Sequence, residues 1–305
     1  MEISKVFVII VTYNGKQWYD RCFGSLRTSE IPVQVIVIDN ASSDDTVSYI
    51  KTNFPEIDLI ESNQNIGFGQ GNNKGIRCAL DNGVDYVFLL NQDAWIQPNT
   101  ISELVKIHNE NSEFGILSPI HLNAEKTAIE KGLMHYIADY KITSTDLIND
   151  LYFKSCKDVY IVKYINAAAW LLPRSTIENI GGFDPIFYHY GEDDNYLQRV
   201  QYHGLKIGIC PEISICHDTE RCVARNSETT QSEYKNLLVE LTDINTNENL
   251  SILVLLDFKK AFFKALKLKF KSAKICLFNG FYKLKMKNKI SKSKIQNKKI
   301  ATSWL

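Results

Sequence analysis

The sequence lacks the long apolar stretch that a membrane-spanning helix needs. Its longest late apolar run, Ile252–Leu256, is far shorter than the ~20 residues that cross a bilayer as a helix. A signal peptide is not indicated either, because the apolar run Val6–Val11 is too short and leads into no cleavage site. The seven cysteines contain no CxxC pair, so a reduced, cytoplasmic setting is expected.

Acidic residues are lacking from the end of the chain. None follows Asp257, whereas fifteen lysines lie between Lys259 and Lys299, so the net charge of zero divides into −15 up to Asp257 and +15 after it. From Ile252 on, apolar residues interleave with these lysines, which predicts a basic amphipathic helix within a helical, lysine-rich region at residues 226–305.

Three kinds of partner fit such a basic region. An anionic membrane surface is the first, because each lysine close to it adds about 1 kcal/mol of attraction. Docking on the protein's own acidic surface or on another protein is the second. Nucleic acid is the third and is not expected, since nothing in the first 257 residues supports it.

Strand-like and helix-like segments alternate along the first third of the chain. Apolar, β-branched runs at residues 6–11, 33–38, 57–61 and 86–90 are separated by helical patterns at 15–27, 42–53 and 67–82. This alternation predicts an α/β fold with a mostly parallel, doubly wound sheet flanked by helices. Further strands are expected at 164–172, 206–210 and 213–216, with a helix at 192–203, while residues 121–160 are irregular.

Polar residues directly follow three of the predicted strands. They are Thr12, Tyr13 and Asn14 after the first, Asp39 and Asn40 after the second, and Asn91, Gln92 and Asp93 after the fourth. In doubly wound sheets, ligands bind beyond the carboxyl ends of the strands. The three groups are therefore expected to face one site.

Asp39 is the first candidate for ligand contact. Its carboxylate can accept a hydrogen bond from the imide N–H of uracil or thymine, and the charge strengthens such a bond. Helix capping is the alternative, and it is the better explanation of Ser43 and Asp44, which stand nearer the next helix.

A glycine-rich segment, residues 65–75, lies at the start of the third predicted helix. It follows the third strand rather than the first, so it does not match a dinucleotide-binding fingerprint. Backbone N–H groups at a helix start can still face phosphate or sugar oxygens. Close packing of the helix on the sheet explains Gly71 and Gly75 equally well.

Acidic and imidazole side chains suited to catalysis stand further along the chain. Asp93 and Asn91 offer oxygen ligands for Mg²⁺ or Mn²⁺, although a turn-bonded loop aspartate would explain Asp93 if it stood alone. Glu192 and Asp193 open a helix, where either can act as a general base or simply complement the helix dipole. His217 ends a strand, where it can complete a metal site, contact a diphosphate or be an ordinary packed histidine.

Six segments stand in a fixed order within residues 5–218. They are Val11–Asn14, Val37–Ser42, Asn65–Gly75, Leu89–Asp93, Gly181–Asp184, and Gly191–Asp193 followed by Arg199. Each alone is a weak signal. Together they resemble the family 2 glycosyltransferases of the GT-A fold, particularly the bacterial rhamnosyltransferase-like branch.

The resemblance implies an inverting transfer of a sugar from a nucleoside diphosphate to an acceptor hydroxyl. Asp93 and His217 would hold Mn²⁺ or Mg²⁺, which offsets charge on the leaving diphosphate. Asp193, or else Glu192, would deprotonate the acceptor. Nucleotide-sugar binding would fall to Thr12, Tyr13, Asn14, Asp39, Asn65, Gly67, Asn72, Asn91 and Gln92, and acceptor binding to Trp170 and Arg199, although Trp170 is equally explained as a core residue.

Two residues depart from the family's pattern. Asn91 stands where many members have Asp in the metal motif, and Asn195 stands where many have a further acid. These departures support an alternative: a catalytically weak homologue that binds nucleotide sugars or polysaccharide.

A transferase domain is expected at residues 1–225, with a nucleotide-sugar half at about 1–118 and an acceptor half at about 119–225. A base contact of Asp39 favours UDP- or dTDP-sugars as donors. The expected acceptor is a saccharide or lipid-linked saccharide of bacterial surface polysaccharide synthesis. The expected location is cytoplasmic, with peripheral attachment to the inner face of the cell membrane.

Overall fold

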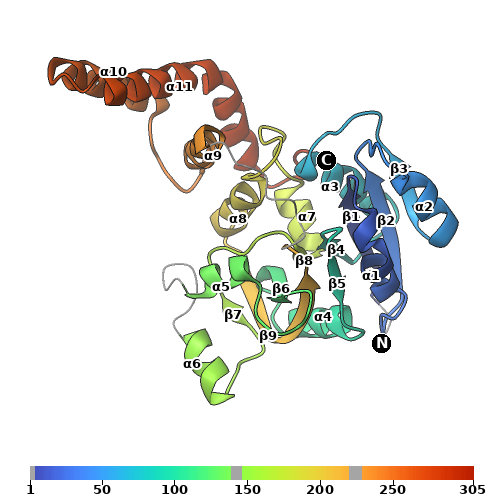
Figure 1. The fold of residues 1–305 in the computed structure, drawn as a ribbon. Helices are drawn as coiled ribbons and strands as arrows, with labels where there is room; N and C mark the ends of the chain where they lie inside the picture. The colour runs from blue at the N-terminus through green and yellow to red at the C-terminus, as the bar shows by residue number, and fades with distance from the viewer. Residues whose placement is uncertain (1–3, 139–145, 220–228) are drawn as a thin grey trace.

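A computed structural model of the chain describes residues 4–138, 146–219 and 229–305. Within these ranges the centre is a nine-stranded sheet in the order β3-β2-β1-β4-β8-β6-β9-β5, with β7 paired to β9 (Figure 1). The strands are β1 (Val6–Thr12), β2 (Val33–Asp39), β3 (Asp58–Glu61), β4 (Tyr86–Leu90), β5 (Ala94–Ile96), β6 (Phe114–Leu122), β7 (Tyr160–Ile161), β8 (Ala169–Pro173) and β9 (Lys206–His217). The helices are α1 (Lys16–Leu26), α2 (Thr46–Asn53), α3 (Phe68–Asp81), α4 (Thr100–Glu110), α5 (Lys131–Ala138), α6 (Asp146–Phe153), α7 (Arg174–Ile180), α8 (Glu192–Tyr202), α9 (Thr229–Thr242), α10 (Leu250–Leu266) and α11 (Phe270–Asn297).

The sheet has a parallel half and a mixed half. β1 pairs in parallel with β2 and β4, and β2 with β3, which confirms the doubly wound arrangement predicted for the first third. β8 runs antiparallel to both β4 and β6, and β9 runs parallel to β6 but antiparallel to β5. The prediction of a mostly parallel sheet therefore holds for the half formed by β3, β2, β1 and β4, whereas the rest is mixed.

Helices cover both faces of the sheet, which explains the unbroken apolar strands. Along β1, Phe7 and Ile9 point into the core under α3, α7 and α8, while Val8 and Ile10 point into the core under α1, α2 and α4. Successive side chains of a strand alternate between faces, so a strand covered on both sides needs apolar residues at every position.

Three element boundaries differ from the sequence prediction. α2 begins at Thr46 rather than at residue 42, because residues 40–43 form a loop bonded to neighbouring strand ends. β8 is shorter than the strand predicted at 164–172. The two strands predicted at 206–210 and 213–216 are one strand, β9, and the apparent gap is a register irregularity where Cys210 and Ser214 pair with consecutive residues of β6.

The region after residue 229 is helical, as predicted. α10 and α11 pack against each other as a hairpin that projects from the rest of the molecule (Figure 1). Lys283 Nζ donates to Asp257 Oδ2 at 2.7 Å across the hairpin, and both side chains are buried. Among the described residues, no helix combines the length and apolar character required to cross a membrane.

The end of the chain returns to the main body. Asp184 Oδ2 accepts hydrogen bonds from Ser293 Oγ at 2.5 Å and from Asn297 Nδ2 at 2.9 Å, both on α11. The Gly182 N–H donates to the Ser303 carbonyl at 2.8 Å. The Gly181–Asp184 segment therefore anchors the C-terminal helix, a role that its turn-like sequence did not reveal.

Candidate active site

The carboxyl ends of β1 and β2 place Thr12 beside Asp39. The two residues are cross-strand partners, and Thr12 Oγ1 lies 3.5 Å from Asp39 Oδ1. Asp39 Oδ2 accepts a hydrogen bond from the Ser42 N–H at 3.1 Å. One oxygen of this buried carboxylate thus shapes the loop before α2, while the Thr46 N–H bonds Asp44, as the capping alternative predicted for Asp44.

Tyr13 and Asn14 are held by neighbouring loops. The Tyr13 N–H donates to Gln92 Oε1 at 3.0 Å, and Gln92 Nε2 donates to the Tyr13 carbonyl at 3.3 Å. Asn14 has a φ of 50° and accepts a bond from the Ser43 N–H at 2.8 Å. The amides of Asn14 and Gln92 therefore join the strand-end loops, and the Tyr13 side chain remains 39% exposed.

The glycine-rich segment is clamped from two sides. Asn40 accepts from the Ile66 N–H at 2.9 Å and donates to the Gly67 carbonyl at 3.1 Å. On the other side, Tyr188 donates through its hydroxyl to the Asn65 carbonyl at 3.2 Å. Gly67 has a φ of 82°, and a Cβ there would collide with the Tyr188 carbonyl oxygen, so the loop before α8 closes directly onto this segment.

Other residues of the segment serve packing. A Cβ at Gly71 would press on Val11, and one at Gly75 on Ile9, so both glycines let α3 lie close to β1. Asn72 is buried and donates to the Phe68 carbonyl at 3.1 Å. One N–H of the Asn72 amide is thus used within its own helix, and the role of Asn72 in nucleotide binding stays a prediction.

Asp93 and His217 meet beside the β5–β9 pairing, where Ala94 is the partner of His217. His217 Nε2 lies 3.4 Å from Asp93 Oδ1 and 3.4 Å from Asn91 Nδ2. Burial lowers the pKa of His217, but the hydrogen bond and charge of Asp93, aided by other nearby carboxylates, outweigh it and raise the pKa above its usual 6.5. Asn91 Oδ1 is buried without a hydrogen-bond partner among the described residues.

These groups suit a divalent cation. A carboxylate, an unpartnered amide oxygen and an imidazole form a mixed oxygen–nitrogen set of the kind that Mn²⁺ accepts. The polar atom of Asn91 that lacks a partner is the observation that fits such an ion, because buried polar atoms are normally satisfied.

Sequence reasoning missed two neighbours of His217. His121 and Glu130 offer atoms that lie, with one of His217, within 4.8 Å of one another. Glu130 accepts bonds from the Gly132 and Leu133 N–H groups, and its charge contributes to the raised pKa of His217. Both residues fall in the stretch 121–160, whose irregular pattern concealed them.

The acidic start of α8 combines a buried and a more accessible carboxylate. Burial, together with the charge of Asp193, raises the pKa of Glu192 to about 7, and only 5% of Glu192 is exposed. Asp193 is less buried, and its Oδ2 accepts a hydrogen bond from the Tyr164 hydroxyl at 3.1 Å. The pKa of Asp194 is also raised, by burial and then by Asp193.

Tyr136 lies between the histidine cluster and the acidic helix. Its ring contacts Tyr164 edge-on at a centroid distance of 4.6 Å. Burial raises the pKa of Tyr136, and its hydrogen bond with Tyr164 lowers it. The charges of Asp193, Asp194 and Glu130 raise it further. Carboxylates that are remote in sequence thus lie close enough to one tyrosine to act on its pKa.

Trp170 and Arg199 are core residues, so the prediction that they bind the acceptor is wrong. Both are fully buried. Trp170 stacks on Phe183 at a centroid distance of 6.3 Å, which agrees with the core alternative. Arg199 donates to the carbonyls of Gly182 and Ile180, so its guanidinium holds the turn before the acidic loop in place.

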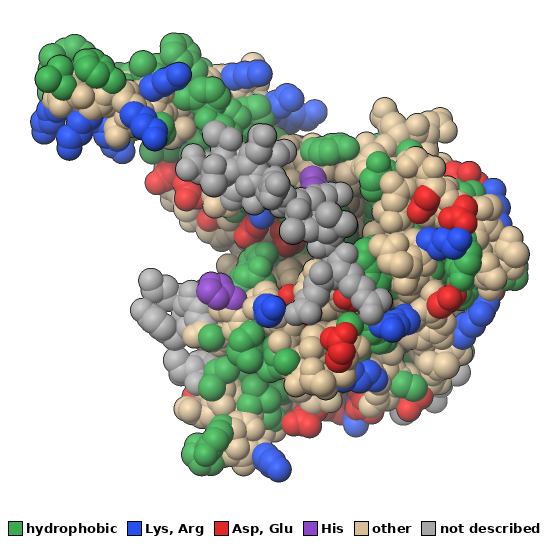
Figure 2. Space-filling view, viewed as in Figure 1, with side chains coloured by type: hydrophobic (Ala, Val, Ile, Leu, Met, Phe, Trp, Pro, Cys, Tyr) green, Lys and Arg blue, Asp and Glu red, His purple; other side chains and the backbone are tan. Residues whose placement is uncertain are grey.

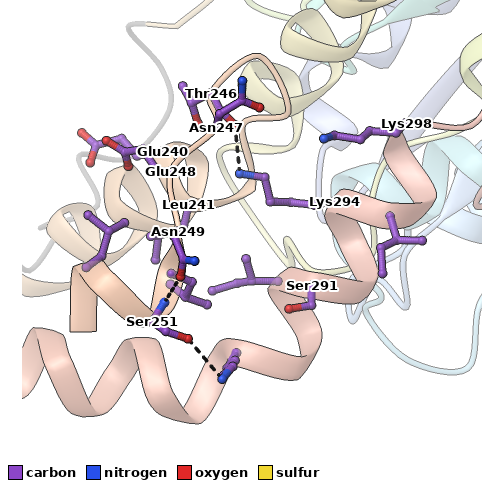
Figure 3. Close-up of a pocket in the computed structure, with 15 residues that line it drawn as sticks. Glu240, Leu241, Thr246, Asn247, Glu248, Asn249, Ser251, Ser291, Lys294 and Lys298 are labelled. Atoms are coloured by element: carbon purple, nitrogen blue, oxygen red, sulfur yellow. Dashed lines mark hydrogen bonds between the residues drawn. The ribbon is translucent and has the colours of Figure 1, made fainter. Parts of the chain in front are cut away.

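A separate pocket lies in the C-terminal region. It has a volume of about 510 Å³ and lies between α11 and the loop joining α9 to α10, with Glu240, Glu248, Lys294 and Lys298 on its walls (Figure 3). None of the candidate active-site residues lines it. This pocket is therefore distinct from the candidate active site.

Comparisons with known proteins show the family and the fold of the chain. A family model described as "Glycosyl transferase family 2" matches residues 7–160, about half of the chain. The chain therefore belongs to glycosyl transferase family 2, and its relatives make it a glycosyltransferase. It is 27% identical over 71% of its length to the "low-salt glycan biosynthesis hexosyltransferase Agl10" of Haloferax volcanii, of which it covers 68%.

A second relative comes from Mycobacterium tuberculosis. The chain is 23% identical to an "N-acetylglucosaminyl-diphospho-decaprenol L-rhamnosyltransferase" over 77% of its own length and 83% of the relative's. These names support the rhamnosyltransferase-like branch of the family.

Solved structures share the fold. S. aureus TarS 1-349 in complex with UDP has a TM-score of 0.58 and 13% identity, with 96% of this chain and 89% of that one covered. The chain spans only 40% of the chain in another TarS structure. The mannosyltransferase PcManGT from Pyrobaculum calidifontis, in complex with GDP-Man and Mn²⁺, has a TM-score of 0.54 and 17% identity, covering 79% of this chain and 63% of that one.

Proposed function

We propose that the protein transfers a sugar, with inversion, from a nucleoside diphosphate to an acceptor hydroxyl. The observation that carries the proposal is the closure of the loop before α8 onto the glycine-rich segment at Gly67 and Tyr188. This contact supports a position of the acidic start of α8 on the strand-end side of the sheet, near Thr12 and Asp39. A uridine or thymidine donor is favoured by a carboxylate at Asp39.

The metal side of the site would receive the donor's diphosphate. Asp93, Asn91 and His217 would hold Mn²⁺ or Mg²⁺, and a PcManGT structure with Mn²⁺ supports that choice. When bound, the cation offsets the negative charge that develops on the leaving diphosphate. Glu130 and His121 lie close to the His217 ring, where they could add ligand atoms for the cation.

Asp193 is the proposed general base. Its carboxylate is the more accessible of the first two acids of α8, and the Tyr164 hydroxyl holds it in place. Accepting the proton of the acceptor hydroxyl lets that oxygen attack the sugar from the face opposite the leaving group. Glu192 is the second choice, because a pKa of about 7 suits proton transfer but its carboxyl is buried.

The acceptor is proposed to be a saccharide or a lipid-linked saccharide of bacterial surface polysaccharide synthesis. The diphospho-decaprenol named for the mycobacterial relative supports a lipid-linked form. In this proposal residues 1–118 bind the donor and residues 119–225 shape the acceptor side.

The test is a screen of donor hydrolysis across UDP- and dTDP-sugars, with and without Mn²⁺. We expect one donor to be hydrolysed in a metal-dependent way, and no hydrolysis of any donor would contradict the proposal. Asp93→Asn should weaken metal-dependent nucleotide binding. Asp193→Asn should preserve that binding and reduce transfer by about 100-fold or more, the usual contribution of a general base.

The rival is a protein that binds nucleotide sugars without catalysis, as the asparagine at position 91 suggests. A pure binder would lose affinity on Asp93→Asn but would be indifferent to Asp193→Asn. Asp58→Asn, on the exposed side of β3, is the matched control and should change neither property.

A further inference from the structure

The outer face of α10 is apolar although it lies on the surface. Five of its side chains are between 48% and 67% exposed: Ile252, Leu255, Phe262, Phe263 and Leu266. Their spacing of three, four and seven residues places them on one side of the helix. The opposite side, with Val254 and Ala261, is buried in the hairpin.

The turn between α10 and α11 is also apolar. Leu268 is 75% exposed and has a φ of 55°, a backbone conformation in which glycine is the usual residue. A leucine there is strained, and most of its side chain remains exposed. Phe270, at the start of α11, is similarly exposed, so the hairpin ends in an apolar tip.

Lysines border this apolar surface. Lys259, Lys260, Lys264 and Lys267 line a hollow of about 360 Å³ together with Leu256 and Phe263. Figure 2 shows hydrophobic and basic side chains side by side over the projecting hairpin. No acidic residue follows Asp257 in the sequence, so the positive charge of the hairpin is almost uncompensated within it.

Two possible partners of this surface, a second copy of the protein and the protein's own acidic surface, fit these observations poorly. A second copy of the hairpin would bring like charges together, because its apolar face carries the same bordering lysines. Within the described residues, no acidic surface of the protein covers this face, since the α10 side chains are exposed and α11 is bonded to the body through Asp184. A lipid bilayer with anionic headgroups above its apolar acyl chains matches both the apolar face of α10 and the lysines that border it.

We propose that the outer face of α10 and the α10–α11 turn dock on an anionic lipid bilayer. Phe262, Phe263 and Leu266 enter the boundary between headgroups and acyl chains, and the lysines contact lipid phosphates. The docking does not depend on the proposed transferase reaction. Failure of docking and failure of catalysis can therefore be measured separately. Docking would bring the enzyme to a lipid-linked acceptor.

The test is co-sedimentation of the full chain with vesicles in the absence of any donor. We expect binding to vesicles of 70% phosphatidylcholine and 30% phosphatidylglycerol at 0.1 M NaCl, and at least tenfold weaker binding to pure phosphatidylcholine or at 0.5 M NaCl. The triple variant Phe262→Ser, Phe263→Ser and Leu266→Ser should bind the anionic vesicles at least tenfold more weakly than the unchanged protein.

Tyr152→Ser with Phe153→Ser is the matched control. These two aromatic residues on α6 are 81% and 73% exposed, so their loss removes similar apolar surface elsewhere on the molecule. The control should bind the vesicles as the unchanged protein does. Equal binding to neutral and anionic vesicles, undiminished binding of the triple variant, or a concentration-dependent dimer that the triple variant abolishes would overturn the proposal.

Discussion

Replacing Glu192 by glutamine is expected to change stability in a strongly pH-dependent way. Burial and the Asp193 charge raise the pKa of Glu192 from 4.5 to about 7 in the folded protein. A carboxyl with a raised folded pKa favours folding only while it is protonated. Its contribution is fully present below pH 4.5 and is lost as the pH rises through about 7.

The size of this effect follows from proton linkage. Between pH 5 and pH 8, ionisation of Glu192 should lower the free energy of unfolding by about 2.5 kcal/mol, to order of magnitude. Glu192→Gln removes that loss. A new buried amide can cost stability of its own, but this cost is the same at both pH values, so it cancels when the two are compared.

The assay is urea unfolding of both proteins at pH 5 and pH 8. The free energy of unfolding of Glu192→Gln, relative to that of the unchanged protein, should be about 2.5 kcal/mol higher at pH 8 than at pH 5. Glu110→Gln, at an exposed position on α4, is the control and should show no such difference. If this difference between the two pH values is below about 0.5 kcal/mol for Glu192→Gln, the reasoning that burial and Asp193 destabilise the ionised Glu192 is refuted.

Three further changes test other parts of the structure. Gly67→Ala should cost about 2–4 kcal/mol in urea unfolding and abolish transfer, because its Cβ would collide with the Tyr188 carbonyl at a positive φ; near-normal stability would disprove that close approach. Asp257→Leu alone should cost about 2–4 kcal/mol by stranding the Lys283 charge, and adding Lys283→Met should recover most of it; additive losses in a double-mutant cycle would show that the pair is not coupled. Leu268→Gly should raise the free energy of unfolding by about 0.5–1 kcal/mol while weakening vesicle binding, and equal binding would remove the tip from the docking surface.

The parallel half of the fold could be predicted because each part of it is local. Continuous apolar runs such as Val6–Val11 can be covered only on both faces, and the polar groups after them must lie at one edge. The structure accordingly places Thr12 next to Asp39 and ties Tyr13 to Gln92.

Other roles depended on contacts between remote segments. Nothing local distinguishes a tryptophan on a ligand from one in the core, so the burial of Trp170 needed the position of Phe183. The family resemblance placed Arg199 at the acceptor, yet its guanidinium is buried and donates to two backbone carbonyls. His121 and Glu130 escaped notice because they approach His217 only after β6 and β9 pair.

The attachment of α11 at Asp184 has a consequence for how the enzyme would meet a flat surface. The helix has 28 residues, so it provides about 42 Å of path between the hairpin tip and the body. One inserted residue would turn the tip by about 100° relative to the body, whereas four would restore nearly the same facing and add about 6 Å. The number of residues in α11 thus determines which way the strand-end side of the sheet faces when the hairpin tip rests on a flat surface.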